Sequence, residues 1–236
     1  MSGSPTTVCF DLDDTLCRPA TPRDEQVAAL FQRADVAPFF DATDLHRRAS
    51  EIDADSEAAF ARRLFGGLVR EQAPPTVAGD DPDAVTRALV TAAAELDAER
   101  DASDVVAVEG ARAVLADLGE THRLALVTNG GRDRQLAKLE ALDLVDAFDA
   151  RVYAEPGEPV KPDPAPFERA LDAVAATPGE TVHVGNSLTS DVGGAHNAGL
   201  TSVWLPDEHS PRDGPEPHHR VDALPEVPGL VRAMGD

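Results

Sequence analysis

The chain has 236 residues, of which 42% are hydrophobic, and its acidic residues outnumber its basic residues by 43 to 21, which gives a net charge of −22. This length and hydrophobic fraction allow a sizeable buried core and argue against a disordered chain. The negative charge repels other polyanions, so we expect neither nucleic acid nor a membrane surface as a partner.

Lysine and cysteine are both scarce. Lys138 and Lys161 are the only lysines, and the remaining basic residues are arginine. Acidic excess with so little lysine resembles proteins of organisms that keep molar salt in the cytoplasm. The two cysteines, Cys9 and Cys17, lack metal-site spacing and are not expected to pair. With no signal-peptide pattern and no apolar run of membrane-spanning length, we expect a cytoplasmic protein of halophilic composition.

The first part of the chain changes from a strand to a long helical block. The apolar run at 6–10 predicts a short buried strand. From 21 to 100 the pattern is helical, and apolar residues recur at helical spacing in three segments, 23–37, 56–72 and 82–98. Proline and glycine between these segments predict breaks.

The second part alternates between helices and strands. The patterns predict strands at 123–127, 150–154, 181–184 and 202–205, and helices at 109–118, at 133–142, after Pro166 and from Asp191. Such alternation predicts a parallel sheet that is covered by helices on both faces. The proline-rich tail at 206–228 is expected to be irregular.

Together these elements predict the α/β fold class, with a Rossmann-like parallel sheet core and an inserted α-helical domain. The first strand comes from the N-terminus, the helical insert then leaves the sheet, and the other strands follow. The predicted domains are a discontinuous core of 1–16 and 105–236 and a helical insert of 17–104. The sequence carries no indication of an oligomeric state.

Polar loops follow four of the predicted strands. Their sequences are DLDDT at 11–15, TNGG at 128–131, VKPDP at 160–164 and GNSLTSD at 185–191. In parallel α/β sheets, active sites lie beyond the carboxyl ends of the strands, so we expect these loops to converge on one pocket. The clustered acids of the first loop need a compensating positive charge there.

The four loops, in this order, resemble the haloacid dehalogenase-like hydrolase superfamily over nearly the whole chain. The matching features are D-x-D-x-T, a hydroxyl residue at a strand end, a lone lysine, and a glycine loop that ends in aspartate. The helical insert resembles the small cap domain of subfamily I, which includes many sugar and nucleotide phosphatases.

This resemblance implies a phosphatase that hydrolyses a small phosphorylated metabolite through an aspartyl-phosphate intermediate. It implies that Asp11 is the nucleophile and that Asp13 is a general acid and then a general base. Thr128 and the N–H groups of Asn129 and Gly130 are expected to bind phosphate near a helix start, and Lys161 is expected to bridge phosphate and Asp11.

The resemblance also implies Mg²⁺ as the cofactor, a cation that takes carboxylate and carbonyl oxygens. The implied ligands are a carboxylate oxygen of Asp11, the backbone carbonyl of Asp13, Asn186 and Asp191. The family more often has aspartate where Asn186 stands, so Asp191 is expected to be the main acidic ligand from the fourth loop.

Other functions compete with a phosphatase. Asp13 argues against a dehalogenase, because the dehalogenases that the chain resembles lack this second acid. A phosphonate hydrolase needs a cap lysine for a Schiff base, and no lysine lies between 17 and 107. A phosphomutase on the same core stays open. A non-catalytic binding protein that has retained the fold is a further alternative, against which the intact acids and Lys161 argue.

Overall fold

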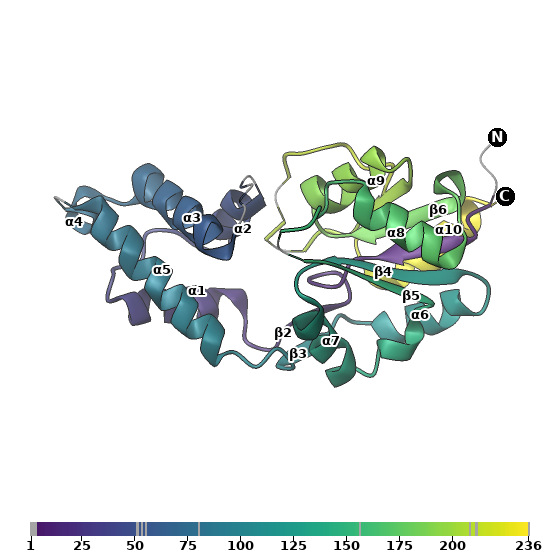
Figure 1. Ribbon diagram of the computed structural model, residues 1–236, viewed down its shortest axis with the longest axis horizontal. Helices are drawn as coiled ribbons and strands as arrows, with labels where there is room; N and C mark the ends of the chain where they lie inside the picture. The colour runs from purple at the N-terminus through teal and green to yellow at the C-terminus, as the bar shows by residue number, and fades with distance from the viewer. Residues whose placement is uncertain are drawn as a thin grey trace. The chain divides into compact units, whose positions relative to one another are not determined.

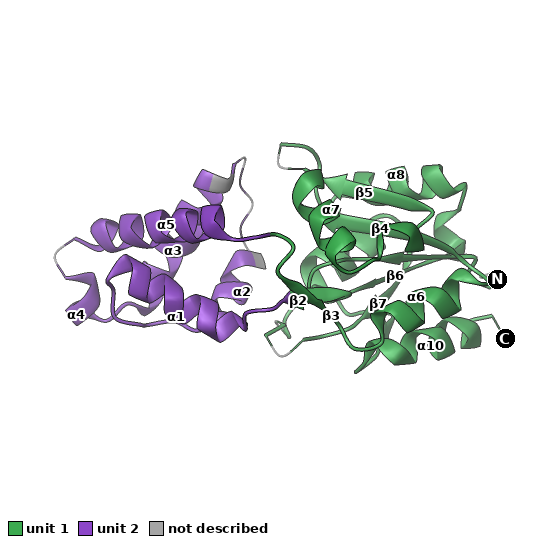
Figure 2. Ribbon diagram, turned by 90° about the horizontal axis from the view of Figure 1, so that it is seen from below, with its two compact units in different colours: residues 1–18, 102–236 green, residues 19–101 purple. Residues whose placement is uncertain are grey.

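The computed structural model describes residues 4–50, 52, 54, 56–79, 81–155, 157–207, 209–210 and 212–235. The chain divides into two compact units (Figure 2), a core unit of Met1–Arg18 with Ala102–Asp236 and a helical unit of Pro19–Asp101. Within the described ranges, no helix has the length and apolar character needed to cross a membrane.

A six-stranded parallel sheet forms the centre of the core unit (Figure 1). The strand order is β5-β4-β1-β6-β7-β8. The strands are β1 (Thr7–Phe10), β4 (Arg123–Asn129), β5 (Ala150–Ala154), β6 (Thr181–Gly185), β7 (Thr201–Trp204) and β8 (His219–Arg220). The predicted α/β fold with a Rossmann-like parallel sheet is therefore confirmed, and the N-terminal strand lies between β4 and β6.

Two layers of helices cover this sheet. On β1, Val8 and Phe10 belong to one apolar cluster, whereas Cys9 between them belongs to another. This alternation follows the two-residue period of a strand, and burial on both faces explains why Val8, Cys9 and Phe10 are all apolar. The first cluster includes residues of α6 (Ala111–Gly119), α7 (Arg132–Ala141) and α10 (Val227–Ala233), and the second includes residues of α8 (Ala165–Val174) and α9 (Gly194–Asn197).

The helical unit has an apolar core of its own. Its helices are α1 (Arg23–Ala34), α2 (Ala42–Ser50), α3 (Glu57–Gln72), α4 (Pro75–Ala78) and α5 (Pro82–Glu99). Phe40 lies between Phe31 and Phe65, with ring centroids 4.5 and 6.3 Å away, and Leu68 is fully buried beside them. A separate core of this kind is the mark of a domain that packs by itself.

Several short elements were missed by the sequence patterns. The tail that was predicted to be irregular contains β8 and the start of α10, so that prediction is wrong in part. The segment at Asp191 belongs to a π-helical turn, Leu188–Gly193, and α9 begins only at Gly194. A two-stranded sheet of β2 (Cys17–Pro19) and β3 (Val105–Ala107) was also missed. Such short elements depend on partners distant in sequence, which periodicity does not reveal.

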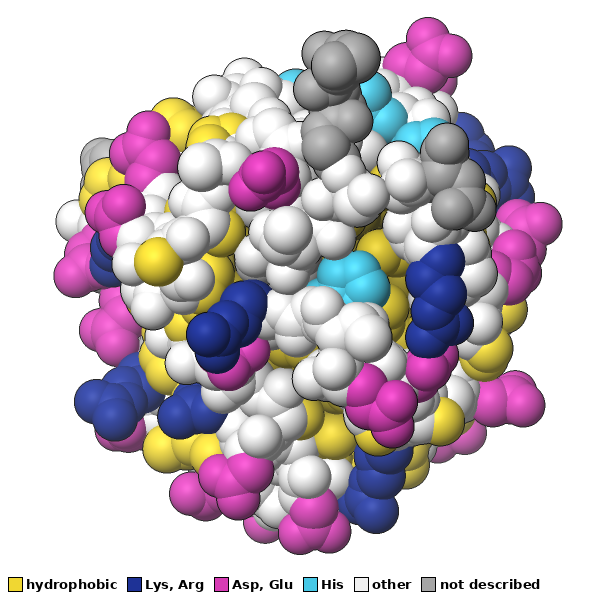
Figure 3. All heavy atoms as spheres, turned by 90° about the vertical axis from the view of Figure 1, so that its right-hand side faces the viewer, with side chains coloured by type: hydrophobic (Ala, Val, Ile, Leu, Met, Phe, Trp, Pro, Cys, Tyr) yellow, Lys and Arg dark blue, Asp and Glu magenta, His cyan; other side chains and the backbone are white. Residues whose placement is uncertain are grey.

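Acidic side chains are scattered over the face of the core unit shown in Figure 3, with basic side chains among them. Some of these charges form exposed ion pairs, such as Arg232–Asp117 at 2.6 Å and Arg220–Asp222 at 2.7 Å. Because exposed ion pairs contribute little to folding stability, the main consequence of this charge is a strongly hydrated surface.

Candidate active site

The loops at the carboxyl ends of the central strands bring the predicted site residues together. Phe10 of β1 is level with Leu126 of β4 and Val184 of β6, so the loops that follow begin at one edge of the sheet. Five of the predicted side chains are buried there although they are polar or charged: Asp11, Thr128, Lys161, Asn186 and Asp191. Asn129 is only partly buried, and the Asp13 side chain is 41% exposed.

Lys161 lies at the centre of this group. Its Nζ donates hydrogen bonds to Asp11 Oδ1 at 2.7 Å, to Asp191 Oδ1 at 2.6 Å and to the carbonyl oxygen of Val127 at 2.8 Å. An ammonium group has three protons, so these three acceptors satisfy it completely. The lysine side chain is only 2% exposed, so its ammonium group is shielded from bulk water, and it joins the first and fourth loops to β4.

Burial and charge act against each other on these groups. Burial raises the pKa of Asp11 to about 7, although the Lys161 ammonium acts to lower it. For Asp191, burial again opposes ionisation, but the pKa is lowered because Lys161 and His183 both stabilise the carboxylate. The pKa of Lys161 is raised because its two carboxylate partners outweigh the effect of burial.

Asp191 has further contacts that the sequence did not reveal. His183 lies on β6, and its Nε2 is 3.0 Å from Asp191 Oδ1. Burial lowers the pKa of His183, which favours the neutral ring. Because a carboxylate oxygen only accepts, Nε2 is the donor in this contact. The backbone N–H of Ser187 donates to Asp191 Oδ2 at 2.9 Å, and a Cβ on Gly185 would overlap the Asp191 carboxyl group. His183 lies within the strand predicted at 181–184; it is buried, and it also holds Asp191 in place.

Asn129 connects the second loop to the third by two hydrogen bonds. Its Nδ2 donates to the carbonyl oxygen of Lys161, and its Oδ1 accepts from the Lys161 N–H, both at 2.9 Å. The reciprocal pair fixes the backbone that carries the lysine. In the first loop, the Thr15 hydroxyl donates to Asp11 Oδ2 at 3.3 Å. Side chains of both loops therefore orient the two charged groups at the centre of the site.

Two residues of α7 that were not predicted as site residues contact Asp13. Lys138 Nζ donates to Asp13 Oδ1 at 2.7 Å and to Oδ2 at 2.8 Å. Gln135 Nε2 lies 3.0 Å from Asp13 Oδ2 and 2.7 Å from the Thr128 hydroxyl oxygen. One signal was available in the sequence, because Lys138 is one of only two lysines and Gln135 precedes it by three residues on the same helix face.

Asn186 has a carboxylate partner in the loop after β7. Its Nδ2 donates to Asp207 Oδ2 at 2.9 Å. The backbone carbonyl oxygen of Asn186 accepts from Trp204 Nε1 at 2.8 Å. The amide of Asn186 is thus oriented from outside the four predicted loops.

The donor set of the site fits a hard divalent cation. Among the residues that the structure describes, no three His, Cys, Asp or Glu side chains are grouped as a metal site. The set implied by the family is of another kind, since it also includes an amide and a backbone carbonyl. Asp11 and Asp191 bring two buried negative charges against the single positive charge of Lys161. Because an excess of buried charge is unfavourable, a cation that prefers oxygen ligands suits these residues.

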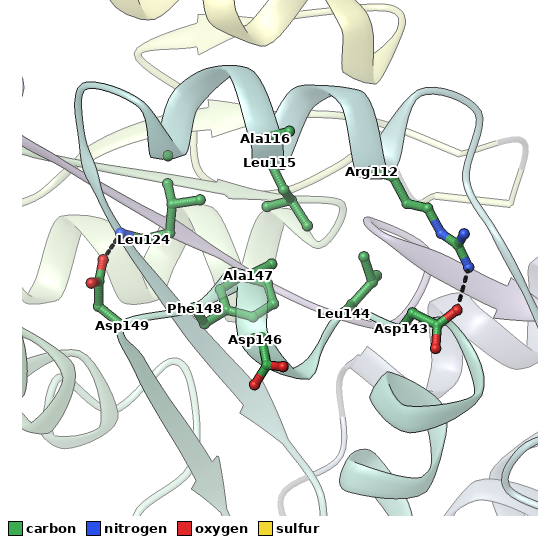
Figure 4. A pocket seen from close by; sticks show the side chains of 11 residues that line it. Arg112, Leu115, Ala116, Leu124, Asp143, Leu144, Asp146, Ala147, Phe148 and Asp149 are labelled. Carbon is green, nitrogen blue, oxygen red and sulfur yellow. Dashed lines mark hydrogen bonds and ion pairs between the residues drawn. The ribbon is translucent and has the colours of Figure 1, made fainter.

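A separate pocket of about 450 Å³ lies at the opposite edge of the sheet (Figure 4). Leu124, near the beginning of β4, and Asp149, just before β5, line it. Asp143 and Asp146 add acidic groups, which would repel a phosphate. This pocket therefore does not belong to the candidate active site.

The fold and the site define an α/β protein with a buried carboxylate–lysine centre at the carboxyl edge of a parallel sheet. Comparison with known families agrees with this class. The family model described as "haloacid dehalogenase-like hydrolase" matches residues 5–199. The chain belongs to the haloacid dehalogenase-like hydrolase family.

Individual relatives are similar to this chain to different extents. An N-acylneuraminate-9-phosphatase of Rattus norvegicus is 35% identical over 129 residues, which are 53% of this chain and 52% of the relative. The chain thus spans about half the length of that relative. A phosphoserine phosphatase of Thermus thermophilus is 34% identical over 92% of this chain and 96% of the relative. Among solved structures, a haloacid dehalogenase-like protein from Streptococcus pneumoniae shares the fold, with a TM-score of 0.69 and 17% identity over 96% of this chain and 98% of its own.

Proposed function

We propose that the protein is a Mg²⁺-dependent phosphatase that hydrolyses the phosphate monoester of a small metabolite. The observation that carries this proposal is the ammonium group of Lys161, which contacts both Asp11 and Asp191 beside the buried Thr128. Membership of the hydrolase family supports it, as do relatives that are named phosphatases.

In the first step, an Asp11 carboxylate oxygen attacks phosphorus and forms an aspartyl-phosphate. The bond between phosphorus and the ester oxygen breaks, and Asp13 gives a proton to the departing oxygen. Lys161 offsets the negative charge of the phosphoryl group, and the Thr128 hydroxyl binds one of its oxygens. The Gly130 N–H, which was expected to bind phosphate, donates instead to the carbonyl oxygen of Ala154 at 2.9 Å.

In the second step, a water molecule attacks the phosphorus of the aspartyl-phosphate. Asp13, now deprotonated, takes a proton from this water. The bond between phosphorus and the Asp11 oxygen breaks, which releases inorganic phosphate and regenerates the Asp11 carboxylate. Each proton that Asp13 donates in the first step is recovered in the second.

The residues proposed to hold Mg²⁺ are Asp11, the backbone carbonyl of Asp13, Asn186 and Asp191. When bound, the cation supplies charge that offsets the repulsion between a carboxylate nucleophile and an anionic ester. The chain's own contribution is to keep these oxygens in place, which Lys161 and His183 do for Asp191.

Release of inorganic phosphate tests the proposal. Purified protein should release phosphate from p-nitrophenyl phosphate in the presence of Mg²⁺ and lose this activity with a chelator. A panel of phosphorylated sugars, nucleotides and organic acids then identifies the substrate class. Conversion of one phosphate ester into its isomer, without phosphate release, would favour the phosphomutase instead; inactivity toward every ester would favour a non-catalytic binding protein.

We also propose that the helical unit acts as a cap domain, over residues 17–104, and that it selects the substrate. This rests on its insertion after β1 and on its separate apolar core. Exchange of this segment for that of a relative with a known substrate should shift the substrate preference toward that of the relative. The requirement for Asp11 should not change. Unchanged preference after the exchange would contradict the proposal.

The acidic, lysine-poor composition leads us to propose that the protein works in a cytoplasm with high salt. Salt screens repulsion between the surface acids, since the Debye length falls to roughly 3 Å at 1 M. The midpoint of thermal unfolding should therefore rise steadily as KCl is added. A midpoint that stays constant or falls between low and molar KCl would contradict this proposal.

Asn186→Asp is expected to tighten Mg²⁺ binding about tenfold. At an effective dielectric of 20, two unit charges 4 Å apart interact by about 4 kcal/mol, and dehydration of the new carboxylate leaves a net gain on the order of 1–2 kcal/mol. The same change places two carboxylates where Asn186 now donates to Asp207, so the Mg²⁺-free protein should unfold more easily. Calorimetric Mg²⁺ titration and urea unfolding measure the two effects.

The matched control exchanges the two side chains, as Asn186→Asp with Asp207→Asn. This double variant keeps the net charge and restores a hydrogen bond between the positions, so it should bind Mg²⁺ tightly without the loss of stability. If the wild type, the single variant and the exchanged pair all bind Mg²⁺ equally well, Asn186 does not lie next to the metal.

A further inference from the structure

Asp13 is the one acid of the proposed mechanism that lies outside the Lys161 centre. Its side chain is 41% exposed, and the residue after it, Asp14, has a left-handed backbone with φ 60°. A short side chain on such a turn has several rotamers of similar energy. An acid that must reach one particular oxygen atom in each step therefore needs contacts that select a single orientation.

Two side chains of α7 provide such contacts. Lys138 Nζ contacts both oxygens of the Asp13 carboxylate, at 2.7 and 2.8 Å, and Gln135 Nε2 contacts Oδ2 at 3.0 Å. The two residues are three positions apart, so they project from the same face of the helix. Both carboxylate oxygens are thereby fixed by a helix that is 122 or more residues away in the sequence.

Gln135 also joins this contact to the phosphate-binding loop. Its Nε2 lies 2.7 Å from the Thr128 hydroxyl oxygen and 3.1 Å from the carbonyl oxygen of Asn129. The glutamine is 1% exposed, so it has little freedom to move. Gln135 consequently fixes the position of the Asp13 side chain relative to the loop that is proposed to bind the phosphate.

The distribution of lysine gives an independent observation. The chain contains 21 basic residues and only two lysines, and each lysine contacts one of the two acids of the D-x-D motif. Lys138 is 12% exposed, whereas Arg232 in the surface pair with Asp117 is 51% exposed. The surface ion pairs described above, Arg232–Asp117 and Arg220–Asp222, both use arginine. Lys138 differs from them, because it is a lysine that is shielded from water and contacts Asp13.

We propose that Lys138 is a positioning residue that, together with Gln135, fixes the orientation of the Asp13 carboxyl group, which in its protonated form donates to the leaving oxygen of the substrate. The inference rests on the proposed phosphatase function. It assigns Lys138 no contact with the reacting atoms, because its role is to act through Asp13.

The test compares two esters whose leaving groups differ in their need for a proton. Glycerol 3-phosphate leaves an alkoxide that requires protonation, whereas p-nitrophenyl phosphate leaves a stable anion. Lys138→Met should lower kcat/KM for the alkyl ester by about 10²-fold, as expected when general acid catalysis is impaired, and for the aryl ester by less than about threefold. Lys138→Arg should retain most of the activity, since its fork can also contact two carboxylate oxygens.

A double-mutant comparison shows whether Lys138 acts through Asp13. Lys138→Met combined with Asp13→Asn should be no less active than Asp13→Asn alone, because the positioned group is already lost. Arg232→Met, which removes an exposed cation from the same unit, is the matched control and should leave both esters unaffected. Equal losses on the two esters, or additive losses in the double variant, would overturn the inference.

The two lysines also allow a measurement that does not depend on activity. Selective ¹⁵N labelling of lysine side chains gives two ammonium signals in an NMR spectrum, and Lys138→Arg assigns them. Asp13→Asn should shift the Lys138 signal and leave that of Lys161 nearly unchanged; an unshifted Lys138 signal would overturn the contact itself. A wild-type protein that is inactive toward every ester of the panel would contradict the proposed function, and the NMR result would still decide whether Lys138 holds Asp13.

Discussion

Asp11→Asn is expected to abolish phosphate release while the protein remains folded. An amide is not a nucleophile toward phosphorus, and loss of a nucleophile in a comparable covalent mechanism lowers kcat by about 10⁶-fold, so we expect a fall of more than about 10⁴-fold. The side-chain size is unchanged, and the asparagine oxygen can still accept from Lys161 while its NH₂ group faces the Thr15 hydroxyl. Because burial disfavours the Asp11 carboxylate, stability should be maintained.

The measurements for this variant are phosphate release and urea unfolding. Asp14→Asn is the matched control, because it makes the same chemical change three residues further on, and asparagine tolerates the left-handed backbone found there. The control should keep activity close to that of the wild type. Residual activity of Asp11→Asn within about tenfold of wild type, far above the loss expected for a nucleophile, would rule out Asp11 in that role.

Lys161→Met is expected to cause the largest loss of stability of any single substitution in the site. It removes the one cation between Asp11 and Asp191, whose side chains are 9% and 2% exposed, and leaves two carboxylates buried together. Breaking a buried ion pair in this way typically lowers the free energy of unfolding by about 3–5 kcal/mol. Urea unfolding without Mg²⁺ measures the loss.

The loss of folding stability in Lys161→Met should depend on pH. With Lys161 present, the folded pKa of Asp11 is already about 7, above the usual value for aspartate, and removal of the ammonium raises it further. A carboxyl group with a raised folded pKa binds its proton more tightly in the folded state, so the variant loses stability as the pH rises. The difference from wild type should therefore be wider above pH 7 than below it. A difference that narrows as the pH rises would contradict this account.

Lys161→Arg separates the charge of this residue from its shape. The guanidinium keeps the positive charge, but its planar fork cannot place one nitrogen within 2.8 Å of three acceptors as the ammonium does. We expect kcat to fall by about 10²–10³-fold, the effect of losing one preorganised donor, with a smaller loss of stability than in Lys161→Met. Full activity would mean that Lys161 supplies only a general positive potential.

The sequence by itself determined the fold class and the residues at the centre of the site. Apolar runs such as 6–10 and 181–184 alternate with helical patterns, and this rhythm is sufficient to predict a parallel sheet. Once the strands are placed, the sheet itself brings their carboxyl ends to one edge. Asp11, Thr128 and Lys161 were predictable for this reason, because each belongs to a polar loop after a strand.

Only the tertiary structure decided which side chains hold those central residues in place. Lys138 contacts Asp13 across 125 positions of sequence, and Asp207 contacts Asn186 from the proline-rich tail. His183 looked like an ordinary strand residue, yet it contacts Asp191. Periodicity reports which face of its own element a residue occupies, whereas these contacts depend on how separate elements pack, and on the rotamers that burial then selects.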